Sequence, residues 1–279
     1  MSSSTISLRT DATLAFLTLD RPDAGNAMNR DFWAALPERI AQIRAHPDLR
    51  AVILASSGRH FSAGMDLSIF AAPDPRIVSG EEGRRSEYIL RLVEHLQSLF
   101  TALEELRMPV LAAVQGACVG AALDLVCCAD MRYCTRDAFF QIKETQLGMT
   151  ADLGTLQRLP RLIPEGLARE LAYTGRKLDA DAALRCGLVN AVFDTHEQML
   201  VAVTGIAREI ATQSPLAVHG SKRMIGYARD HDLQDSLHMM ACWQAGMFRV
   251  EDMGRAMRAA ATGTPPAYDP LLPADSCGL

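Results

Sequence analysis

The stretch of sequence that decides the fold is Val110-Leu-Ala-Ala-Val-Gln-Gly-Ala-Cys-Val-Gly-Ala-Ala-Leu-Asp-Leu125. Its first five residues are apolar and typical of a short buried strand, and two glycines then permit a tight turn before a segment that can begin a helix. The same order occurs upstream, where the apolar residues 51–55 precede the loop Ser57-Gly-Arg-His-Phe-Ser-Ala-Gly-Met-Asp-Leu67. Strands, loops and helices that alternate in this way predict an α/β fold with crossover connections.

The segments around these loops extend the pattern toward the N-terminus. Residues 5–9 and 13–19 are β-prone and predict an opening hairpin. Asn29 is a good capping residue for a helix that ends at about Ala45, and apolar residues at helical spacing predict a second helix over 82–106. Residues 71–80 contain two prolines and predict a loop.

The pattern changes after about residue 195, where helical segments over 197–212, 216–229 and 233–261 follow one another without a strand. We therefore expect a core over residues 1–195 that contains the site, and a helical C-terminal region over residues 196–279. Six methionines lie in these helices, and methionines at helical spacing usually pack in a core or between subunits. They are Met224, Met239, Met240, Met247, Met253 and Met257.

Composition excludes several functional classes. The chain has 279 residues, 49% of them apolar, and a formal net charge of −5 without a basic run, so nucleic acid is not an expected partner. The longest apolar stretch, 108–123, is too short and too interrupted to span a bilayer. The seven cysteines form no C-x-x-C pair, and they predict small buried residues in a reducing compartment. A cytoplasmic protein is the resulting expectation.

Both glycine-containing loops offer backbone amides where the side chains are small. The first turn of a helix has unsatisfied N–H groups and partial positive charge, so it is suited to hold a developing oxyanion. Two such donors would polarise one carbonyl. The alternative interpretation is that these loops are simply close-packed turns.

Three carboxylates follow in a mostly uncharged part of the chain: Asp124, Glu144 and Asp152. Acids in apolar surroundings have raised pKa values and can take part in proton transfer. The alternative is a structural role, in which Glu144 pairs with Lys143 or Arg158 and Asp152 caps a helix that starts near Thr155.

Taken together, these residues resemble the enoyl-CoA hydratase/isomerase (crotonase) superfamily. Phe61-Ser-Ala-Gly-Met-Asp66 is similar to its first oxyanion-hole loop, and Gly116-Ala-Cys-Val-Gly-Ala-Ala-Leu-Asp124 to its second. Within the superfamily, the segments 132–144 and 151–160 are most similar to the dienoyl-CoA isomerases. The likeness extends from the opening hairpin to about Met257. It implies a spiral of ββα units with a helical C-terminal trimerisation region.

The resemblance also implies roles for single residues. The amides of Ala63 and Ala121 would hold the thioester oxygen of an acyl-CoA, and Gly64, Met65, Asp66 and Leu67 would contact the substrate. The family often has three glycines where this chain has Gly120-Ala121-Ala122, which narrows the expected pocket.

The three acids distinguish the activities within the superfamily. Hydratases use two acids, at the positions of Asp124 and Glu144, whereas dienoyl-CoA isomerases resemble this chain in having all three. Glu144 would remove the C2 proton of a 3,5-dienoyl-CoA, Asp152 would deliver a proton at C6, and Asp124 would share or orient the protons. The implied activity is isomerisation to 2,4-dienoyl-CoA in fatty-acid β-oxidation.

Two alternatives remain at this point: a 2-enoyl-CoA hydratase that uses Asp124 and Glu144, and a non-catalytic acyl-CoA-binding protein. No metal or redox cofactor is implied, because CoA is part of the substrate. Arg59, Lys222 and Arg223 are candidate contacts for its phosphates. The resemblance implies a homotrimer or a dimer of trimers, and neither nucleic acid nor membrane is an expected partner.

Overall fold

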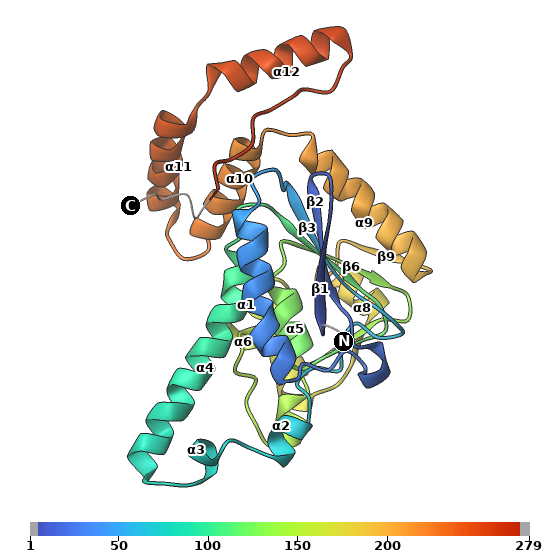
Figure 1. Cartoon of the computed structure of the whole chain (residues 1–279), viewed down its shortest axis with the longest axis vertical. Helices are drawn as coiled ribbons and strands as arrows, with labels where there is room; N and C mark the ends of the chain where they lie inside the picture. The colour runs from blue at the N-terminus through green and yellow to red at the C-terminus, as the bar shows by residue number, and fades with distance from the viewer. Residues whose placement is uncertain (1–4, 274–279) are drawn as a thin grey trace.

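A six-stranded sheet forms the centre of the computed structural model, which describes residues 5–273 (Figure 1). Its strand order is β1-β2-β3-β4-β6-β9; β1 and β2 form an antiparallel hairpin, and the other neighbours are parallel. A smaller sheet joins β5, β7 and β8. The strands are β1 Ile6–Asp11, β2 Leu14–Leu19, β3 Ala51–Ser56, β4 Val110–Val114, β5 Ala117–Val119, β6 Met131–Thr135, β7 Phe139–Gln141, β8 Leu178–Asp179 and β9 Ala191–Phe193.

Helices connect the strands and continue to the C-terminal end of the described chain. The α-helices are α1 Arg30–Ala45, α2 Ser68–Ala71, α3 Pro75–Val78, α4 Glu82–Glu104, α5 Ala121–Cys127, α6 Thr155–Arg158, α7 Glu165–Thr174, α8 Ala180–Arg185, α9 His196–Ala211, α10 Pro215–Tyr227, α11 Leu233–Met247 and α12 Val250–Thr262. Short 3₁₀ turns are η1 Pro22–Ala24, η2 Glu144–Leu147 and η3 Leu159–Arg161. None of the helices within residues 5–273 is long and apolar enough to cross a membrane.

The two sheets grow together, one step at each turn of the chain. After β3, Ser62 forms a parallel bridge with Cys118 of β5. After β4 the chain makes β5 and α5, and after β6 it makes β7, which pairs in parallel with β5. The turn after β3 contributes a single bridge beside the small sheet, and the later turns each contribute a strand to it, which gives the expected spiral.

The large sheet is covered on both faces, as an almost continuously apolar parallel sheet requires. Val52 and Leu54 of β3 belong to the larger apolar core, together with buried residues of α1, α4 and α5. The alternate residues Ala51 and Ile53 face a second cluster that includes Met199 of α9. Figure 1 shows α1, α4 and α5 on one side of the sheet and α9 on the other.

The predicted elements of the N-terminal half are confirmed, with one difference. Asn29 caps α1 by accepting a hydrogen bond from the Phe32 amide at 3.0 Å. The stretch 71–80, expected as a loop, instead contains the whole of α3, because Asp74 caps this turn and Pro75 has the backbone angle that suits a first helical residue. Arg76 of α3 lies over the ring of Tyr88, so this turn is attached to α4.

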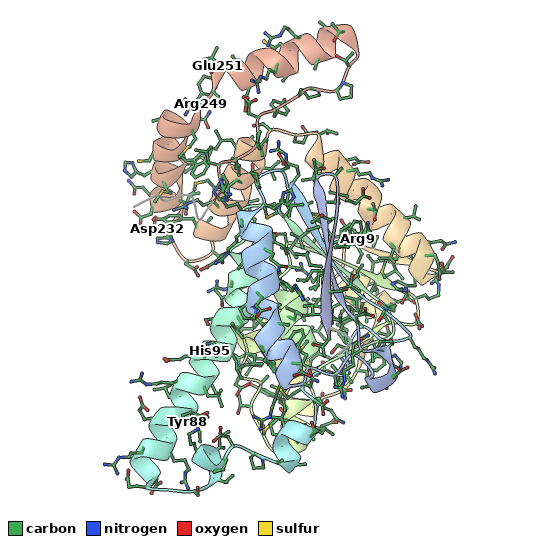
Figure 2. The ribbon with its side chains drawn as sticks, viewed as in Figure 1. Arg9, Tyr88, His95, Asp232, Arg249 and Glu251 are labelled. Atoms are coloured by element: carbon green, nitrogen blue, oxygen red, sulfur yellow. The ribbon has the colours of Figure 1, made fainter. Side chains whose placement is uncertain are left out.

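The C-terminal helices α11 and α12 extend away from the rest of the molecule (Figure 1). The helix expected over 233–261 is divided, because Phe248 and Arg249 have extended backbone angles between α11 and α12. None of the residues of α11 is buried, and of α12 only Ala259 is. Most side chains of the two helices are exposed, and Figure 2 labels Glu251 of α12 and Arg249, which lies between the helices.

The methionines of these helices are therefore not core residues of one chain. Met240, Met247, Met253 and Met257 are each exposed. Of the cysteines, four are buried as expected, Cys186 is half-buried and Cys242 is exposed, while Cys277 lies outside the described residues.

Candidate active site

The two glycine-containing loops lie side by side. The Ser62 amide donates to the Ala117 carbonyl at 3.0 Å, and the Val119 amide donates to the Ser62 carbonyl at 3.1 Å. Gly64 has a φ of +88°, and a β-carbon there would lie 2.4 Å from the Val119 carbonyl oxygen and 3.4 Å from the Ala121 nitrogen. Glycine at this position therefore lets the first loop reach the start of α5.

The hydrogen bonds of the first loop correct the expectation for Ala63. Its amide donates to the Gly25 carbonyl at 2.9 Å and is not free for a ligand. Around the next residues, the Met28 amide donates to the Gly64 carbonyl and the Asp66 amide donates to the Met28 carbonyl. Met65 lies between these two bonds, so its amide points away from Met28, as alternation along an extended strand requires.

Among the loop amides without an acceptor are two that lie beside the contact between Gly64 and the start of α5, those of Met65 and Ala121. Within residues 5–273, neither the Met65 amide nor the Ala121 amide has a hydrogen-bond acceptor. Ala121 is the first residue of α5, where an unpaired N–H group is expected. The pair of candidate oxyanion donors is therefore Met65 and Ala121, and the sequence pattern F-x-A-G-x-D did not show which of its amides stays free.

Gly120 connects the second loop to the acids. Its backbone has a φ of 56° and a ψ of −125°, which favours glycine, and a β-carbon there would lie 3.0 Å from Oε1 of Glu144. Glu144 therefore lies directly beside the turn that presents the Ala121 amide.

Asp124 lies in the first turn of α5 and is almost fully buried. Burial raises its pKa to about 7, and repulsion from Glu144 and Asp152 acts in the same direction, while hydrogen bonding from Thr155 opposes the rise. The Thr155 amide donates to Oδ1 of Asp124 at 2.5 Å. Asp124 thus caps the start of α6 from another element, which corrects the interpretation that Asp152 caps this helix.

Glu144 begins η2 and has neither of the partners that a structural role would need. Lys143 donates to Gln146 and Arg158 donates to Glu104. Oε2 of Glu144 is buried without a hydrogen-bond partner among the described residues. Burial raises the pKa of Glu144, and the negative charge of Asp152 adds to the rise. Backbone hydrogen bonds from Glu144 and Lys143 oppose this rise, but burial outweighs them, and a carboxylate with a raised pKa and an unpaired oxygen is a good proton acceptor.

Asp152 lies between two buried residues, Ala151 and Leu153, but is itself exposed in the single chain. This corrects the expectation of an apolar setting. Partial desolvation still raises its pKa. The negative charge of Asp152 acts to raise the pKa of both Glu144 and Asp124, so Asp152 lies close enough to both acids to influence their ionisation.

The sequence reasoning missed the residues that support the first loop. Arg21 donates to Asp66 at 2.5 Å, and its backbone amide donates to Oδ1 of Asn26. The side-chain amide of Asn26 donates to the carbonyls of Ser57 and His60, both at 2.8 Å. The available signal was the dipeptide Gly25-Asn26 after a strand, a turn marker that brings the chain back toward the loop.

Other expected contacts are placed differently. Lys222 donates to Asp130 at 2.8 Å and to the Met108 carbonyl, so it fastens α10 to the sheet rather than offering a charge to a phosphate. Arg223 lies over the ring of Trp243. Leu67 is 65% exposed at the surface of the first loop. Within residues 5–273, no group of three His, Cys, Asp or Glu side chains is arranged to hold a metal ion.

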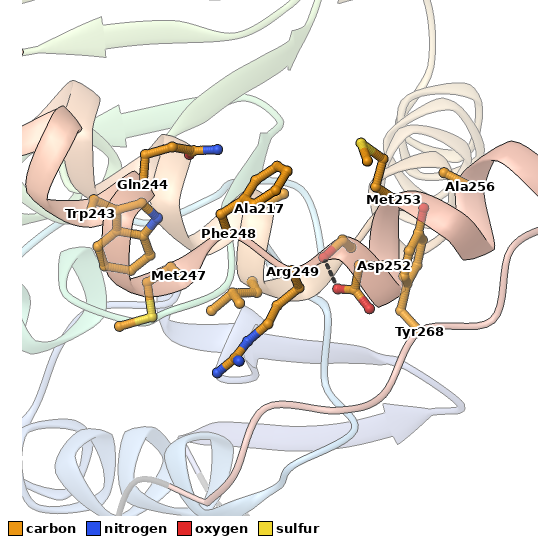
Figure 3. A pocket seen from close by; sticks show the side chains of 12 residues that line it. Ala217, Trp243, Gln244, Met247, Phe248, Arg249, Asp252, Met253, Ala256 and Tyr268 are labelled. Atoms are coloured by element: carbon orange, nitrogen blue, oxygen red, sulfur yellow. Dashed lines mark hydrogen bonds between the residues drawn. The ribbon is translucent and has the colours of Figure 1, made fainter.

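A cavity of about 250 Å³ lies away from these acids, between α10, α11 and α12 (Figure 3). Trp243, Met247, Phe248 and Met253 contribute much of its lining. Its polar edge includes Asp252, which accepts a hydrogen bond from the Ser214 hydroxyl at 2.8 Å. None of the candidate site residues lines this cavity.

Comparison with known proteins relates this geometry to one family. Residues 9–262 match the enoyl-CoA hydratase/isomerase family. The chain is 43% identical over 244 residues to the mitochondrial Δ(3,5)-Δ(2,4)-dienoyl-CoA isomerase of Mus musculus. The aligned residues cover 87% of this chain and 74% of the relative. It is 38% identical over 251 residues to the peroxisomal enzyme of that name from Arabidopsis thaliana, covering 90% of each.

Hydratases are similar at lower identity. The crotonyl-CoA hydratase of Syntrophomonas wolfei is 32% identical over 255 residues, covering 91% of this chain and 94% of the relative. Among solved structures, the enoyl-CoA hydratase of Bacillus anthracis has a TM-score of 0.84 and 28% identity, covering 95% of this chain and 99% of the hydratase. The crotonase fold expected from the sequence is confirmed.

These relatives correct the expectation of a cytoplasmic protein. The dienoyl-CoA isomerases are named as mitochondrial or, in the Arabidopsis thaliana protein, peroxisomal. The expectation was wrong because free, buried cysteines and a mildly acidic surface suit any reducing compartment and do not distinguish the cytoplasm from the others.

Proposed function

The chain belongs to the enoyl-CoA hydratase/isomerase family, and we propose that it isomerises 3,5-dienoyl-CoA thioesters to 2,4-dienoyl-CoA in fatty-acid β-oxidation. The observation that carries this proposal is a group of three acids, in which the charge of Asp152 acts on Asp124 and Glu144, beside two free main-chain amides. The identity to dienoyl-CoA isomerases, higher than to the hydratase, supports the same activity.

The two free amides would act on the thioester. Hydrogen bonds from Met65 and Ala121 to the thioester oxygen stabilise the negative charge that forms there when a proton leaves C2. Each preorganised donor of this kind typically contributes about 10²- to 10³-fold to the rate. Because the donors are main-chain groups, the side chains of Met65 and Ala121 can vary without loss of these hydrogen bonds.

Glu144 would be the base at C2. Its carboxylate lies beside the turn that presents the Ala121 amide, where the thioester end of the substrate must lie. Its raised pKa makes it a better proton acceptor than an ordinary carboxylate. Removal of the C2 proton gives a dienolate whose charge extends along the conjugated system to C6.

Asp152 would be the acid at C6. It lies eight residues beyond Glu144, on the far side of η2, and its raised pKa favours the protonated form that delivers a proton. Protonation at C6 moves both double bonds and gives the conjugated 2,4-dienoyl thioester. Asp124, whose Oδ1 is occupied by the Thr155 amide, would couple the two acids rather than contact the reacting carbons.

We infer that the reaction needs no metal or redox cofactor, because proton transfer and oxyanion stabilisation account for every bond change and CoA is part of the substrate. The spiral core over residues 1–195 would contain the site. The helical region over residues 196–279 would assemble a homotrimer or a dimer of trimers, although its first helix, α9, packs on the large sheet.

An assay with two substrates tests the proposed function. A 3,5-dienoyl-CoA should gain the absorbance of a conjugated 2,4-diene, while a simple 2-enoyl-CoA should lose little of its absorbance by hydration. Asp152→Asn should lower kcat for isomerisation by about 10²-fold or more, the usual contribution of a positioned acid. Rapid hydration of the 2-enoyl-CoA without isomerisation would instead establish the hydratase, and binding without turnover would establish a non-catalytic protein.

A further inference from the structure

We propose that Gln97 of α4 is a positioning residue for Asp152, and that one face of α4 determines where Asp152 delivers its proton. This inference rests on the proposed function. Nε2 of Gln97 donates to the backbone carbonyl of Asp152 at 2.6 Å, a contact between residues 55 positions apart in the chain. The bond acts on the backbone of Asp152, so it leaves the carboxyl group free for the substrate.

Two further residues on the same face of α4 hold the end of the same segment. Thr101 and Glu104 follow Gln97 by four and seven positions, which places all three side chains on one side of the helix. Arg158, the last residue of α6, donates to the Thr101 hydroxyl at 3.0 Å and to the Glu104 carboxylate at 2.8 Å. The segment from Asp152 to Arg158 is therefore attached to α4 at both ends.

The middle of this segment is held as well. A β-carbon at Gly154 would lie 1.9 Å from Nη1 of Arg158, and the φ of Gly154 is +122°, so the guanidinium packs directly on a glycine turn. The next amide, that of Thr155, donates to Asp124. With three attachments within seven residues, the backbone beside Asp152 has little freedom, although its side chain is exposed.

The need for such attachment follows from the chemistry. Glu144 is half-buried with Oε2 enclosed, but the exposed Asp152 gains no comparable support from packing. A displacement of about 1 Å can lower a reaction rate by as much as 10²-fold. Of the attachments described for residues 5–273, the bond from Gln97 is the one that reaches the Asp152 carbonyl itself.

Loss of this bond should change how the dienolate partitions between protonation at C2 and at C6, without changing how fast the dienolate forms. In D₂O, proton removal by Glu144 followed by return at C2 gives recovered substrate labelled at C2, while delivery at C6 gives product. A displaced Asp152 slows delivery and leaves removal intact. The ratio of C2 exchange to isomerisation should therefore rise, which a general loss of folding would not cause.

The test compares Gln97→Leu with Ser98→Ala as a matched control. Ser98 is the next residue of α4, and its hydroxyl donates only to the His95 carbonyl of the same helix. For Gln97→Leu we expect kcat to fall by about 10-fold with KM within about twofold, and the exchange ratio, measured by mass spectrometry of recovered substrate, to rise by about 10-fold. Ser98→Ala should leave kcat, KM and the exchange ratio unchanged.

Thr101→Val, which removes one of the bonds to Arg158, provides a second variant in the same assay and should raise the exchange ratio by a smaller factor. The inference is overturned if Gln97→Leu and Thr101→Val, or whichever of them folds, have the exchange ratio of wild type. Its failure is distinct from failure of the proposed function, because the latter would appear as a wild-type enzyme that does not isomerise the dienoyl-CoA at all.

Discussion

At the scale of single residues, the site depends on which polar groups are already occupied. Ala63 has the position that the family motif suggests, yet its amide is used by Gly25. Met65 and Ala121 keep free amides, and Glu144 keeps a free carboxylate oxygen. The types of residue needed for the chemistry were visible in the sequence. The sequence did not show which of their polar groups lack a hydrogen-bond partner, because this depends on hydrogen bonds between segments far apart in the chain.

The raised pKa of Asp124 leads to a prediction about stability. The folded state binds the proton of this carboxyl more tightly than the unfolded chain does, since burial raises the pKa from 3.8 to about 7. Its contribution to stability is therefore fully present below about pH 4 and is lost as pH rises through about 7, with an upper value of about 4 kcal/mol.

Asp124→Asn should remove this part of the pH dependence while keeping an oxygen for the Thr155 amide. The measurement is the free energy of unfolding by denaturant from pH 4 to pH 8, for wild type and variant. Wild type should lose stability relative to the variant across this range. Parallel curves would show that Asp124 does not titrate in this way.

At the scale of elements, strands β1 to β4 and helices α1, α4, α9 and α10 were predictable because apolar spacing and capping residues are local signals. The hairpin, α1 and α4 are of this kind. The division between α11 and α12 was missed because no proline marks the break at Phe248, and Gly246 alone does not end a helix. The support of the first loop by residues 21–28 was also missed, since these contacts span more than thirty positions.

This support predicts a role for the ion pair between Arg21 and Asp66. Asp66 follows Met65 directly, and the Arg21 guanidinium holds its pKa down at about 2, so the pair is intact at neutral pH. Asp66→Asn should loosen the loop that presents the Met65 amide. We expect kcat to fall by about 10-fold with a smaller change in KM, because an oxyanion donor acts mainly in the transition state.

Steady-state kinetics with the dienoyl-CoA checks this prediction. Asp194→Asn is the matched control, because it breaks an ion pair of the same type with Arg136 on the exposed surface. A rise in KM with kcat unchanged would place Asp66 in ground-state binding of the substrate and not in support of the oxyanion donor.

At the scale of the whole molecule, the single chain leaves an apolar surface uncovered. Along α11 and α12, the exposed side chains include Leu233, Leu237, Met247, Val250 and Met257. Exposed apolar surface of this extent usually marks a contact with another chain. Packing of a second copy would cover the methionines that the sequence pattern assigned to a core or an interface.

The proposed assembly is tested by Leu237→Lys, which places a charge on a side chain that is 61% exposed in the single chain. In a trimer this charge would be buried, so we expect the variant to elute from size-exclusion chromatography as a smaller species than wild type. Leu184→Lys, at a 43% exposed leucine of α8, is the control and should elute with wild type. Unchanged elution of Leu237→Lys would place the subunit contact elsewhere.

The position of deuterium in the product tests the central claim most directly. The enzyme would convert a 3,5-dienoyl-CoA in D₂O, and NMR of the 2,4-dienoyl product would locate the label. Delivery of a proton by Asp152, which exchanges with solvent, predicts one deuterium at C6. A product that instead carries the original C2 hydrogen at C6 would show that one acid performs both transfers, and it would contradict the two-acid account.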